Sequence, residues 1–343
     1  MLLAIPLAAF IMATLASQFL ARSPGILSGM VDEPNARSLH TGAIPRTGGI
    51  ALLVGLAAAG LLGVSAGLRP TGAGVWILLA LLPVATISLL DDGGGVRPRY
   101  RLAAHLVAGA FMVAGGLGWA RLDLPGLTLN LGAFPSGCLT LLLVVWMVNL
   151  YNFMDGMDGL AGGMAVCGFG ALATLGWRGG ELDYALTCAS IAAVAVGFLT
   201  ANFPPARLFL GDLGSTMLGL LAAALALQGS ALGLFPLWVA GLAFSPFIID
   251  ATSTLVRRAL RREPLWQAHR SHHYQRLVLA GWSHRRVMLR AWALMAACAA
   301  CAVAAPGLIP PDQWLLMASW AGIYVLIGYR VRLVEHQSSE GTP

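Results

Sequence analysis

The chain has 343 residues, of which 58% are hydrophobic and only 10% are charged, and its formal net charge at pH 7 is +6. Because a soluble globular domain carries roughly 25% charged residues, this composition excludes an ordinary soluble protein. Apolar runs of about 20 residues, long enough to cross a bilayer, recur along nearly the whole sequence. The sequence therefore predicts an all-α polytopic integral membrane protein that folds as a single domain over residues 1–343.

Eleven membrane-spanning helices are expected. The first apolar run begins at Leu2 with no basic region before it, so it is predicted to be a helix rather than a signal peptide. Between the fourth and fifth spans, residues 120–135 alternate polar and apolar side chains around Pro125 and Gly126, which predicts a small hairpin. The predicted spans are 2–21, 48–67, 74–90, 102–119, 136–154, 160–177, 184–201, 213–232, 235–256, 286–304 and 314–331.

All 21 basic residues are arginine, and their distribution orients the predicted spans. The connections on one side of the membrane, together with the C-terminal tail, hold 17 of them, whereas the other side holds only Arg69, Arg121 and Arg178. By the positive-inside rule the arginine-rich side is cytoplasmic, so the N-terminus is outside and the C-terminus is cytoplasmic. Topology and anionic lipid explain the positive charge, and no nucleic acid is needed.

Two adjacent carboxylates end the third span in the segment "SLLDDGGGVRPRYRL". Asp91 and Asp92 repel each other at an apolar boundary, so either a nearby cation or a raised pKa is expected. An aspartate at a helix C-terminus also opposes the helix dipole, which favours a functional role over an ordinary charged cap. We predict that both aspartates are catalytic and that Arg101, ten residues after Asp91, contacts a phosphate.

The segment "LYNFMDGMDGL" places four polar residues, spaced by three, at the end of the fifth span: Asn149, Asn152, Asp155 and Asp158. On a straight helix this spacing drifts by about 60° per step, so the first and last residues would point in opposite directions. Gly156 and Gly159 predict a break that lets Asp158 start the next helix. The result would be a wall of oxygen ligands suited to Mg²⁺ and to a polar ligand.

The segment "NFPPARLFLGDLGSTMLG" combines a helix break with one further acid. Asn202, Pro204 and Pro205 end a span, and Asp212 precedes the next apolar run. Asp212 could be a helix N-cap, with Ser215 three residues later. A capping aspartate can also present its second oxygen to a metal, so both interpretations stay open.

Two basic segments complete the set of candidate residues. In "VDEPNARSLHTGAIPRTGGI", a Thr47-Gly48-Gly49 turn with free N–H groups would suit an anion. In "RREPLWQAHRSHHYQRL", histidines and arginines gather, and phosphate contact is favoured over a zinc site because no cysteine or clear acid partner accompanies them. The candidate phosphate contacts are Arg37, His40, Arg46, His269, Arg270, His272, His273 and Arg276.

Carboxylates for a divalent cation beside basic side chains, all at one membrane surface, favour phosphoryl transfer from a soluble donor to a lipid acceptor. A secondary transporter or scramblase is the main alternative, but transporter sites lie near the bilayer midplane, and these acids lie at span ends. A lipid phosphatase or a CDP-alcohol transferase is a further alternative.

Five segments match, in order, the motifs of a known family. They extend from residue 32 to residue 277 and read "DEPNARSLHTGAIPRTGG", "DDGGGVRPRYRL", "NLYNFMDGMDGLAGG", "NFPPARLFLGDLGS" and "HRSHHYQRL". In these five segments the sequence resembles the bacterial polyprenyl-phosphate N-acetylhexosamine-1-phosphate transferases. The resemblance implies transfer of the sugar phosphate of a UDP-N-acetylhexosamine to undecaprenyl phosphate, with UMP as the second product. It also implies Mg²⁺ (or Mn²⁺) as cofactor, an inner-membrane location, an active site facing the cytoplasm, and a homodimer as one possible assembly.

The resemblance also implies roles for individual residues. Asp212 and Asn152 match positions that hold the metal and the diphosphate. Asp91 and Asp92 match an acidic pair. Deprotonation of the lipid phosphate by one of them stays open, because this phosphate is already largely ionised near neutral pH. Phe209 matches a ring that stacks on the uracil, and Asp155 and Asn202 match residues near the nucleoside. Arg270, with His269 beside it, matches contacts to the diphosphate.

The sequence departs from the common family pattern at two places. Arg101 stands where many members carry lysine, and His272 and His273 are followed by tyrosine and glutamine rather than a third histidine. The "HRSHHYQ" form resembles a subgroup that starts O-antigen, similar to undecaprenyl-phosphate N-acetylglucosamine-1-phosphate transferases. UDP-N-acetylmuramoyl-pentapeptide is therefore not the expected donor, whereas N-acetylglucosamine, N-acetylfucosamine and N-acetylquinovosamine stay open.

Overall fold

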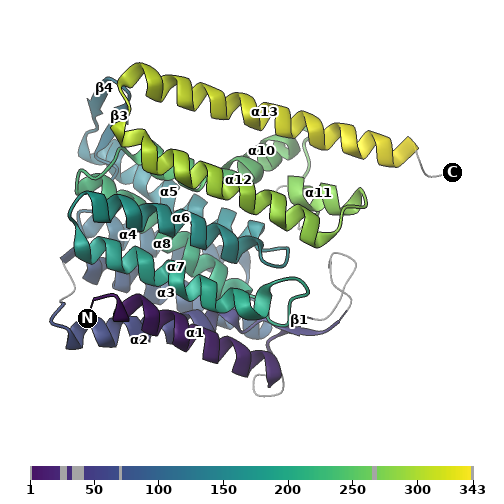
Figure 1. Ribbon diagram of the computed structural model, residues 1–343, viewed down its shortest axis with the longest axis horizontal. Helices are drawn as coiled ribbons and strands as arrows, with labels where there is room; N and C mark the ends of the chain where they lie inside the picture. The colour runs from purple at the N-terminus through teal and green to yellow at the C-terminus, as the bar shows by residue number, and fades with distance from the viewer. Residues whose placement is uncertain (1, 24–28, 33–41, 69–71, 265–268, 341–343) are drawn as a thin grey trace.

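The computed structural model describes residues 2–23, 29–32, 42–68, 72–264 and 269–340. Figure 1 shows a bundle of roughly parallel and antiparallel helices with two very small sheets at its ends. The first half of the bundle contains α1 (Ala4–Arg22), α2 (Gly48–Ser65), α3 (Gly72–Gly94), α4 (Pro98–Ala114), α5 (Ala133–Met154), α6 (Leu160–Arg178) and α7 (Leu182–Asn202). The second half contains α8 (Gly211–Ala231), α9 (Leu237–Ala243), α10 (Ser245–Leu260), α11 (His273–Leu279), α12 (His284–Ala304), the 3₁₀ turn η1 (Ala305–Gly307) and α13 (Pro310–Glu340).

Helix α8 forms the centre of the bundle. Of its most apolar 18-residue window, 89% is buried inside the protein, against 11% for α13 and 28% for α1. Helices pack in a bilayer by close contact of small residues rather than by a hydrophobic drive. At Gly219 of α8 a Cβ atom would lie 2.5 Å from the carbonyl oxygen of Met147 on α5, so the two helices touch backbone to backbone. The site described below is built around the first turn of this central helix.

Each predicted span corresponds to a helix, except that one span consists of two helices with a bend between them. Within the described residues, nine helices are long and apolar enough to cross a membrane, or ten if α9 and α10 together form one span. The predicted span 235–256 is wrong as a single straight helix, because α9 and α10 meet at 84°. Pro246 lies in the first turn of α10, where proline is tolerated at a helix start but not inside a continuous helix. Helix α4, with 17 residues, is just under the span length, so the count of eleven stays a prediction.

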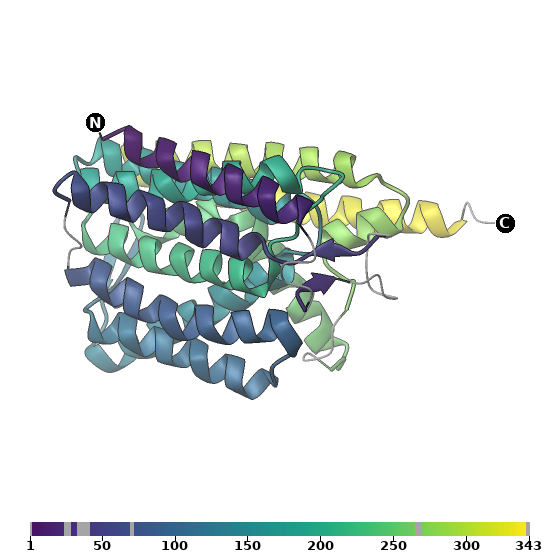
Figure 2. The same ribbon diagram turned by 90° about the horizontal axis from the view of Figure 1, so that it is seen from below.

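The predicted hairpin is confirmed. Strands β3 (Arg121–Leu124) and β4 (Leu127–Asn130) pair antiparallel, and Pro125 and Gly126 form the turn, with Gly126 at a φ of +76°. At the opposite end of the bundle, β1 (Val31–Asp32) and β2 (Ile44–Pro45) form the second sheet. Figure 2 shows the chain termini at opposite ends of the bundle, with β1, β2 and α11 near the C-terminal end. The predicted odd number of membrane crossings requires the two termini to lie at opposite ends. Which terminus faces the cytoplasm stays a prediction.

Cysteine labelling tests the predicted orientation. In a background lacking the five native cysteines, we expect Thr128→Cys in β4 to react with a membrane-impermeant maleimide in intact cells. Ser283→Cys, in the exposed connection before α12, should react only after the cells are permeabilised, because the arginine-rich end faces the cytoplasm. The opposite labelling pattern would invert the topology.

Candidate active site

Asp92 caps the first turn of α8. Its Oδ1 accepts a hydrogen bond from the backbone N–H of Asp212 at 2.8 Å, and its Oδ2 accepts from the N–H of Leu213 at 2.9 Å. The first N–H groups of a helix lack intrahelical partners, and a carboxylate placed there also faces the positive end of the helix dipole. Asp92 is buried, with 7% of its surface exposed. The side chain predicted to be catalytic therefore holds in place the helix that carries Asp212.

We expect Asp92→Asn to lower the free energy of unfolding by about 1–2 kcal/mol. An amide offers one oxygen, so one of the two N–H groups of α8 would face the NH₂ group and lose its acceptor. Thermal unfolding of the purified protein in detergent measures this change. A variant with parental stability but no turnover would instead assign Asp92 to the chemistry and contradict its role as a cap.

Arg101 joins two acids that lie far apart in the sequence. Its Nη1 donates to Oδ2 of Asp91 at 2.6 Å and lies 3.7 Å from Oδ2 of Asp212. Asp91 is held from the other side by the backbone N–H of Val96, at 2.5 Å from its Oδ1. The Arg101 guanidinium, in the first turn of α4, therefore joins the C-terminal end of α3 to the first turn of α8. An anionic group that enters here would find a guanidinium already oriented toward it.

Asn152 brings α5 to the same point. Its Nδ2 donates to Oδ1 of Asp212 at 2.7 Å and to Oγ of Ser215 at 3.0 Å. The alternative of Asp212 as an N-cap is wrong, because α8 begins at Gly211 and the cap is supplied by Asp92. The Asp212 carboxylate is thus available to a ligand, with Asn152 and Arg101 on either side of it.

The donor set at this point fits Mg²⁺. Mg²⁺ keeps several of its waters and is usually held by one or two carboxylates together with substrate phosphates, rather than by a cage of protein ligands. Within the part of the chain that the structure describes, no group of three His, Cys, Asp or Glu is placed to hold a metal alone. Asp212 and the amide oxygen of Asn152 offer hard oxygen ligands.

Asp155 is a further acid beside Asp212 and Asp92. It follows the last residue of α5, and none of the described residues donates a hydrogen bond to its carboxylate. Burial, and then the neighbouring charges of Asp212 and Asp92, raise the pKa of Asp155 well above its ordinary value, while Arg46 acts in the opposite direction. The raised pKa favours the neutral form of this carboxyl.

The predicted break after α5 is confirmed, but its details differ. Helix α6 begins at Leu160, and its N-cap is Gly159 at a φ of +71°, so the prediction that Asp158 starts the helix is wrong. Asp158 instead accepts a hydrogen bond from the backbone N–H of Ala206 at 3.0 Å. Asn202 accepts from the N–H of Gly159 and donates to the carbonyl of Leu208, both at 2.8 Å. These side chains join the α5–α6 and α7–α8 connections, so they position the loops that carry Asp155 and Phe209.

The turn at Thr47-Gly48-Gly49 does not offer free N–H groups, and the prediction of an anion site there is wrong. The N–H groups of Gly48 and Gly49 donate at 2.8 Å to the carbonyls of Phe209 and Leu210. In return, the N–H of Phe209 donates to the carbonyl of Pro45 at 2.8 Å. The two connections therefore pair like short strands, which fixes the backbone beside the first turn of α8. The ring of Phe209 is partly exposed, and its stacking on uracil stays a prediction.

Two further predicted site residues, Arg46 and Asn149, contact other side chains of the protein. The Arg46 guanidinium pairs with Asp32 of β1. Arg37 and His40 lie outside the described residues. Asn149 donates to the carbonyl of Val145 at 2.7 Å, and its Nδ2 lies 3.3 Å from Nδ1 of His105 on α4. Asn149 therefore links α5 to α4 one turn deeper in the bundle than Asn152.

Asp250 on α10 organises the histidine segment. Its Oδ1 accepts from the backbone N–H of His273 at 2.9 Å and lies 3.4 Å from Nδ1 of His272. Burial, and then the nearby His272 and Arg258, lower the pKa of His269 to about 4, so this ring is neutral near pH 7. Nδ1 of His269 lies 2.9 Å from Oγ of Ser271. The described histidines contact a carboxylate and a hydroxyl group rather than converging on a metal site. This arrangement does not favour the zinc alternative.

The histidine segment and the acidic cluster lie at the same end of the bundle. The hydroxyl of Tyr274 donates to the carbonyl of Phe153 at 3.4 Å, and it would lie 2.2 Å from a Cβ atom at Gly156. Helix α11 therefore packs directly on the connection that carries Asp155. Gly156 is required here because a side chain would collide with the tyrosine ring.

Comparisons with known proteins agree with this arrangement. Residues 75–230 match the model of glycosyl transferase family 4. A probable undecaprenyl-phosphate N-acetylglucosaminyl 1-phosphate transferase of Bacillus subtilis is 32% identical over 268 residues, covering 76% of this chain and 73% of its own length. An undecaprenyl-phosphate alpha-N-acetylglucosaminyl 1-phosphate transferase of Yersinia pestis is 27% identical over 331 residues, covering 93% of this chain and 88% of its own length. A phospho-N-acetylmuramoyl-pentapeptide-transferase of Geobacillus thermodenitrificans is 31% identical over 273 residues, covering 73% and 80%.

The chain belongs to the polyprenyl-phosphate N-acetylhexosamine-1-phosphate transferases. In this polyprenyl-phosphate transferase the matched residues run from α3 to the end of α8, so they contain the Asp91–Arg101–Asp212 cluster and Asn152. Arg46 and the histidine segment lie outside the matched residues. Their placement beside the cluster comes from the structure alone.

Sequence reasoning identified Asp250 only as one of the acids at the predicted span ends and gave it no role in the site. The only signal was its position: a carboxylate inside an apolar span is costly, and such residues are functional candidates. Its partners His272 and His273 lie more than 20 residues later, across the connection after α10, so the pairing could not be read from spacing.

Proposed function

We propose that this protein transfers N-acetylhexosamine 1-phosphate from a UDP-sugar to undecaprenyl phosphate at the cytoplasmic face of a bacterial inner membrane. The products would be a lipid-linked diphosphate sugar, which starts O-antigen or another surface glycan, and UMP. The observation that carries the proposal is that Asp91, Arg101 and Asp212 converge at the first turn of α8. The relatives named above support the same reaction class.

The proposed reaction is a displacement at phosphorus. An oxygen of the lipid phosphate attacks the sugar-linked phosphorus of the donor, and the bond from this phosphorus to the oxygen shared with UMP breaks. Negative charge grows on the leaving UMP and on the oxygens of the transferred group. Arg101 faces this charge with two-pronged donors. Asp91 holds Arg101 in place, and Asp92 fixes the helix that positions Asp212.

A divalent cation would be held by Asp212 and Asn152. When bound, it would neutralise diphosphate charge as a Lewis acid. The lipid phosphate is already largely ionised near neutral pH, so no carboxylate is needed as a general base. The neutral ring of His269 can donate or accept a hydrogen bond at the diphosphate, whereas Asp250 keeps His272 and His273 oriented.

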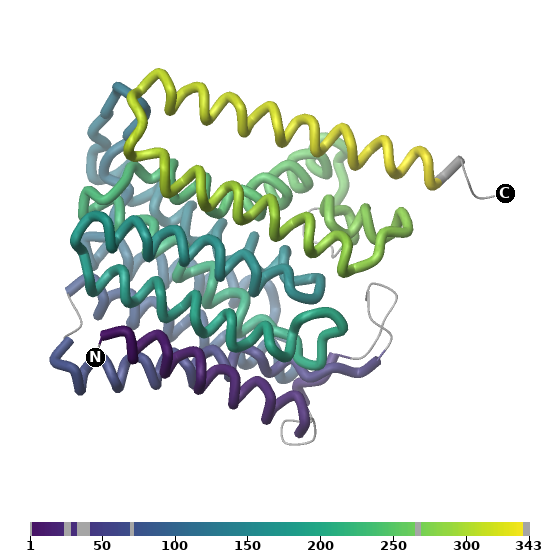
Figure 3. The backbone as a smooth tube through the Cα atoms, viewed as in Figure 1, coloured from purple at the N-terminus to yellow at the C-terminus, as the bar shows by residue number. Residues whose placement is uncertain are grey.

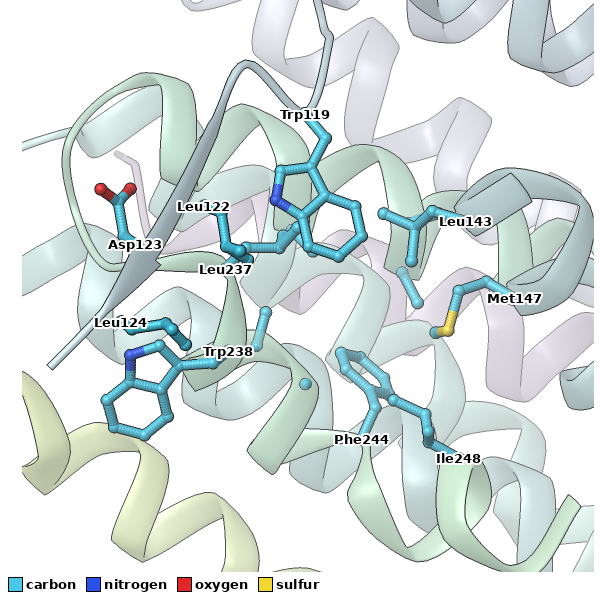
Figure 4. Close-up of a pocket in the computed structure, with 15 residues that line it drawn as sticks. Trp119, Leu122, Asp123, Leu124, Leu143, Met147, Leu237, Trp238, Phe244 and Ile248 are labelled. Atoms are coloured by element: carbon cyan, nitrogen blue, oxygen red, sulfur yellow. The ribbon is translucent and has the colours of Figure 1, made fainter. Parts of the chain in front are cut away.

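An apolar cavity supports a lipid acceptor. A pocket of about 200 Å³ lies between the β3–β4 hairpin, α5, α8 and the bend between α9 and α10. Figure 4 shows the side chains that line it. Leu143 and Met147 of α5 face Phe244 at this bend, and Trp119 and Trp238 close the outer part. Since Met147 is five residues before Asn152 on α5, a prenyl chain lying in this pocket would have its phosphate end directed toward the acidic cluster.

The proposal is tested with purified protein in lipid nanodiscs, undecaprenyl phosphate, Mg²⁺ and a panel of UDP-sugars. We expect UMP release with a UDP-N-acetylhexosamine, and its loss when the metal is chelated and its return when Mg²⁺ is added back. Release of UDP or of inorganic phosphate would indicate a glycosyltransferase or a phosphatase instead. A transporter would release no product.

The same panel tests the donor. The "HRSHHYQ" segment lacks a third consecutive histidine, so we expect UDP-N-acetylmuramoyl-pentapeptide to give roughly a hundredfold less UMP than the preferred N-acetylhexosamine donor, a discrimination typical of a mismatched polar site. The muramoyl-pentapeptide transferase relative makes this comparison necessary. Equal UMP release from the two donors would contradict the predicted specificity.

A further inference from the structure

Arginine side chains also gather around a cavity, and two of them, Arg270 and Arg276, are among the candidate phosphate contacts. A cavity of about 620 Å³ lies between the C-terminal end of α10, the segment before α11, and the last turns of α13. Its size is that of ordinary ligand sites. The charged lining consists of six arginines and two glutamates: Arg257, Arg258, Arg261, Arg270, Arg276, Arg332, Glu263 and Glu335.

The two glutamates balance only part of this charge. Arg258 donates to Glu263 at 2.9 Å, and Arg276 forms a two-pronged pair with Glu335 of α13. Arg261, Arg270 and Arg332 have no carboxylate partner among the residues that the structure describes. They come from three separate elements and line one cavity. Like charges held this close repel, so an anion is the expected occupant.

The cavity lies at the end of the bundle that is predicted to face the cytoplasm. Figure 3 shows α13 passing beside α11 and continuing past the other helices at this end of the bundle. Close by in the chain, between α11 and α12, the ring of Trp282 lies under the guanidinium groups of Arg286 and Arg290, 4.2 and 4.3 Å from the ring centroid. Tryptophan and arginine in this combination are typical of the headgroup region.

We propose that this cavity binds the phosphate of an anionic phospholipid headgroup. Basic pockets between membrane helices on the cytoplasmic side bind such headgroups. The ligand would bridge Arg332 on α13 to Arg261 at the end of α10, and α13 is the span with the least buried surface. Bound lipid would add a contact to a helix that is also held by the Arg276–Glu335 pair and by hydrogen bonds of Tyr324 and Trp314.

The binding test uses native mass spectrometry of the delipidated protein in neutral detergent, titrated with phosphatidylglycerol or with phosphatidylcholine. We expect saturable phosphatidylglycerol binding that Arg261→Gln and Arg332→Gln each weaken about fivefold, and the double variant roughly thirtyfold, from the usual contribution of one basic side chain at a lipid surface. Arg330→Gln is the matched control. It removes the same charge from α13, is exposed, and does not line the cavity.

Thermal unfolding gives a second measurement that does not depend on catalysis or on the proposed function. Phosphatidylglycerol should raise the unfolding temperature of the parent and of Arg330→Gln, but not of the double variant. If the double variant fails to fold, the single variants and Arg332→Lys, which keeps the charge, serve instead. Unchanged phosphatidylglycerol affinity in the Arg261 and Arg332 variants would overturn the proposal. So would arginine-dependent binding of inorganic phosphate with no preference for the anionic lipid, since that result identifies a soluble ligand.

Discussion

Asp212→Asn should lower turnover by roughly a hundredfold or more, the scale found when one group that stabilises transition-state charge is removed. The amide keeps the shape of the side chain and can still meet Asn152 and Arg101, but it is a much weaker ligand for a hard cation. Because Asp92 rather than Asp212 caps α8, the variant should unfold at nearly the parental temperature. UMP release at saturating donor and acceptor, measured over a Mg²⁺ titration, gives the effect.

Asp183→Asn is the matched control. Asp183 also lies in the first turn of an apolar helix, α7, but at the opposite end of the bundle. It should keep parental turnover, which separates loss of the ligand from any general effect of removing a first-turn charge. Full activity of Asp212→Asn at limiting Mg²⁺ would place the metal elsewhere.

Arg101→Ala should lose on the order of a hundredfold in turnover, whereas Arg101→Lys should stay within roughly tenfold of the parent. The guanidinium contacts Asp91 and lies within ion-pair distance of Asp212, so its removal leaves two carboxylates facing each other without a cation. A lysine restores the charge but not the two-pronged geometry. Turnover of both variants at saturating Mg²⁺ and donor measures the difference.

Arg97→Ala supplies the comparison for Arg101. Arg97 is the residue before α4, is exposed, and shares the predicted role of a cytoplasmic anchor. If both alanine variants turn over like the parent, Arg101 is one dispensable anchor among many and the phosphate site is misplaced.

The membrane spans could be predicted because hydropathy is a local property of about 20 residues. The hairpin at 120–135 was equally local, since Pro125 and Gly126 define its turn. The elbow between α9 and α10 was missed although Pro246 marks it, because an apolar run of 22 residues reads as one span unless the bend is known.

The site residues were identified by type, but their partners were not. Asp92 and the N–H group of Asp212 are 120 residues apart, so the capping of α8 from α3 depends on tertiary packing. For the same reason the Thr47-Gly48-Gly49 turn was read as a free anion site, although the connection at Phe209 and Leu210 accepts its hydrogen bonds. Spacing shows which polar groups share an element, and it does not show which groups from other elements will satisfy them.

Following the donor's sugar-linked phosphorus tests the central claim most directly. A UDP-N-acetylhexosamine labelled with ³²P in this position is incubated with the protein, Mg²⁺ and undecaprenyl phosphate. We predict that the label moves into the organic phase as a lipid diphosphate sugar, with unlabelled UMP in water, and that Asp212→Asn abolishes the transfer. Label that stays in UDP, or appears as inorganic phosphate, would contradict the assignment of the Asp91–Arg101–Asp212 cluster to phosphoryl transfer.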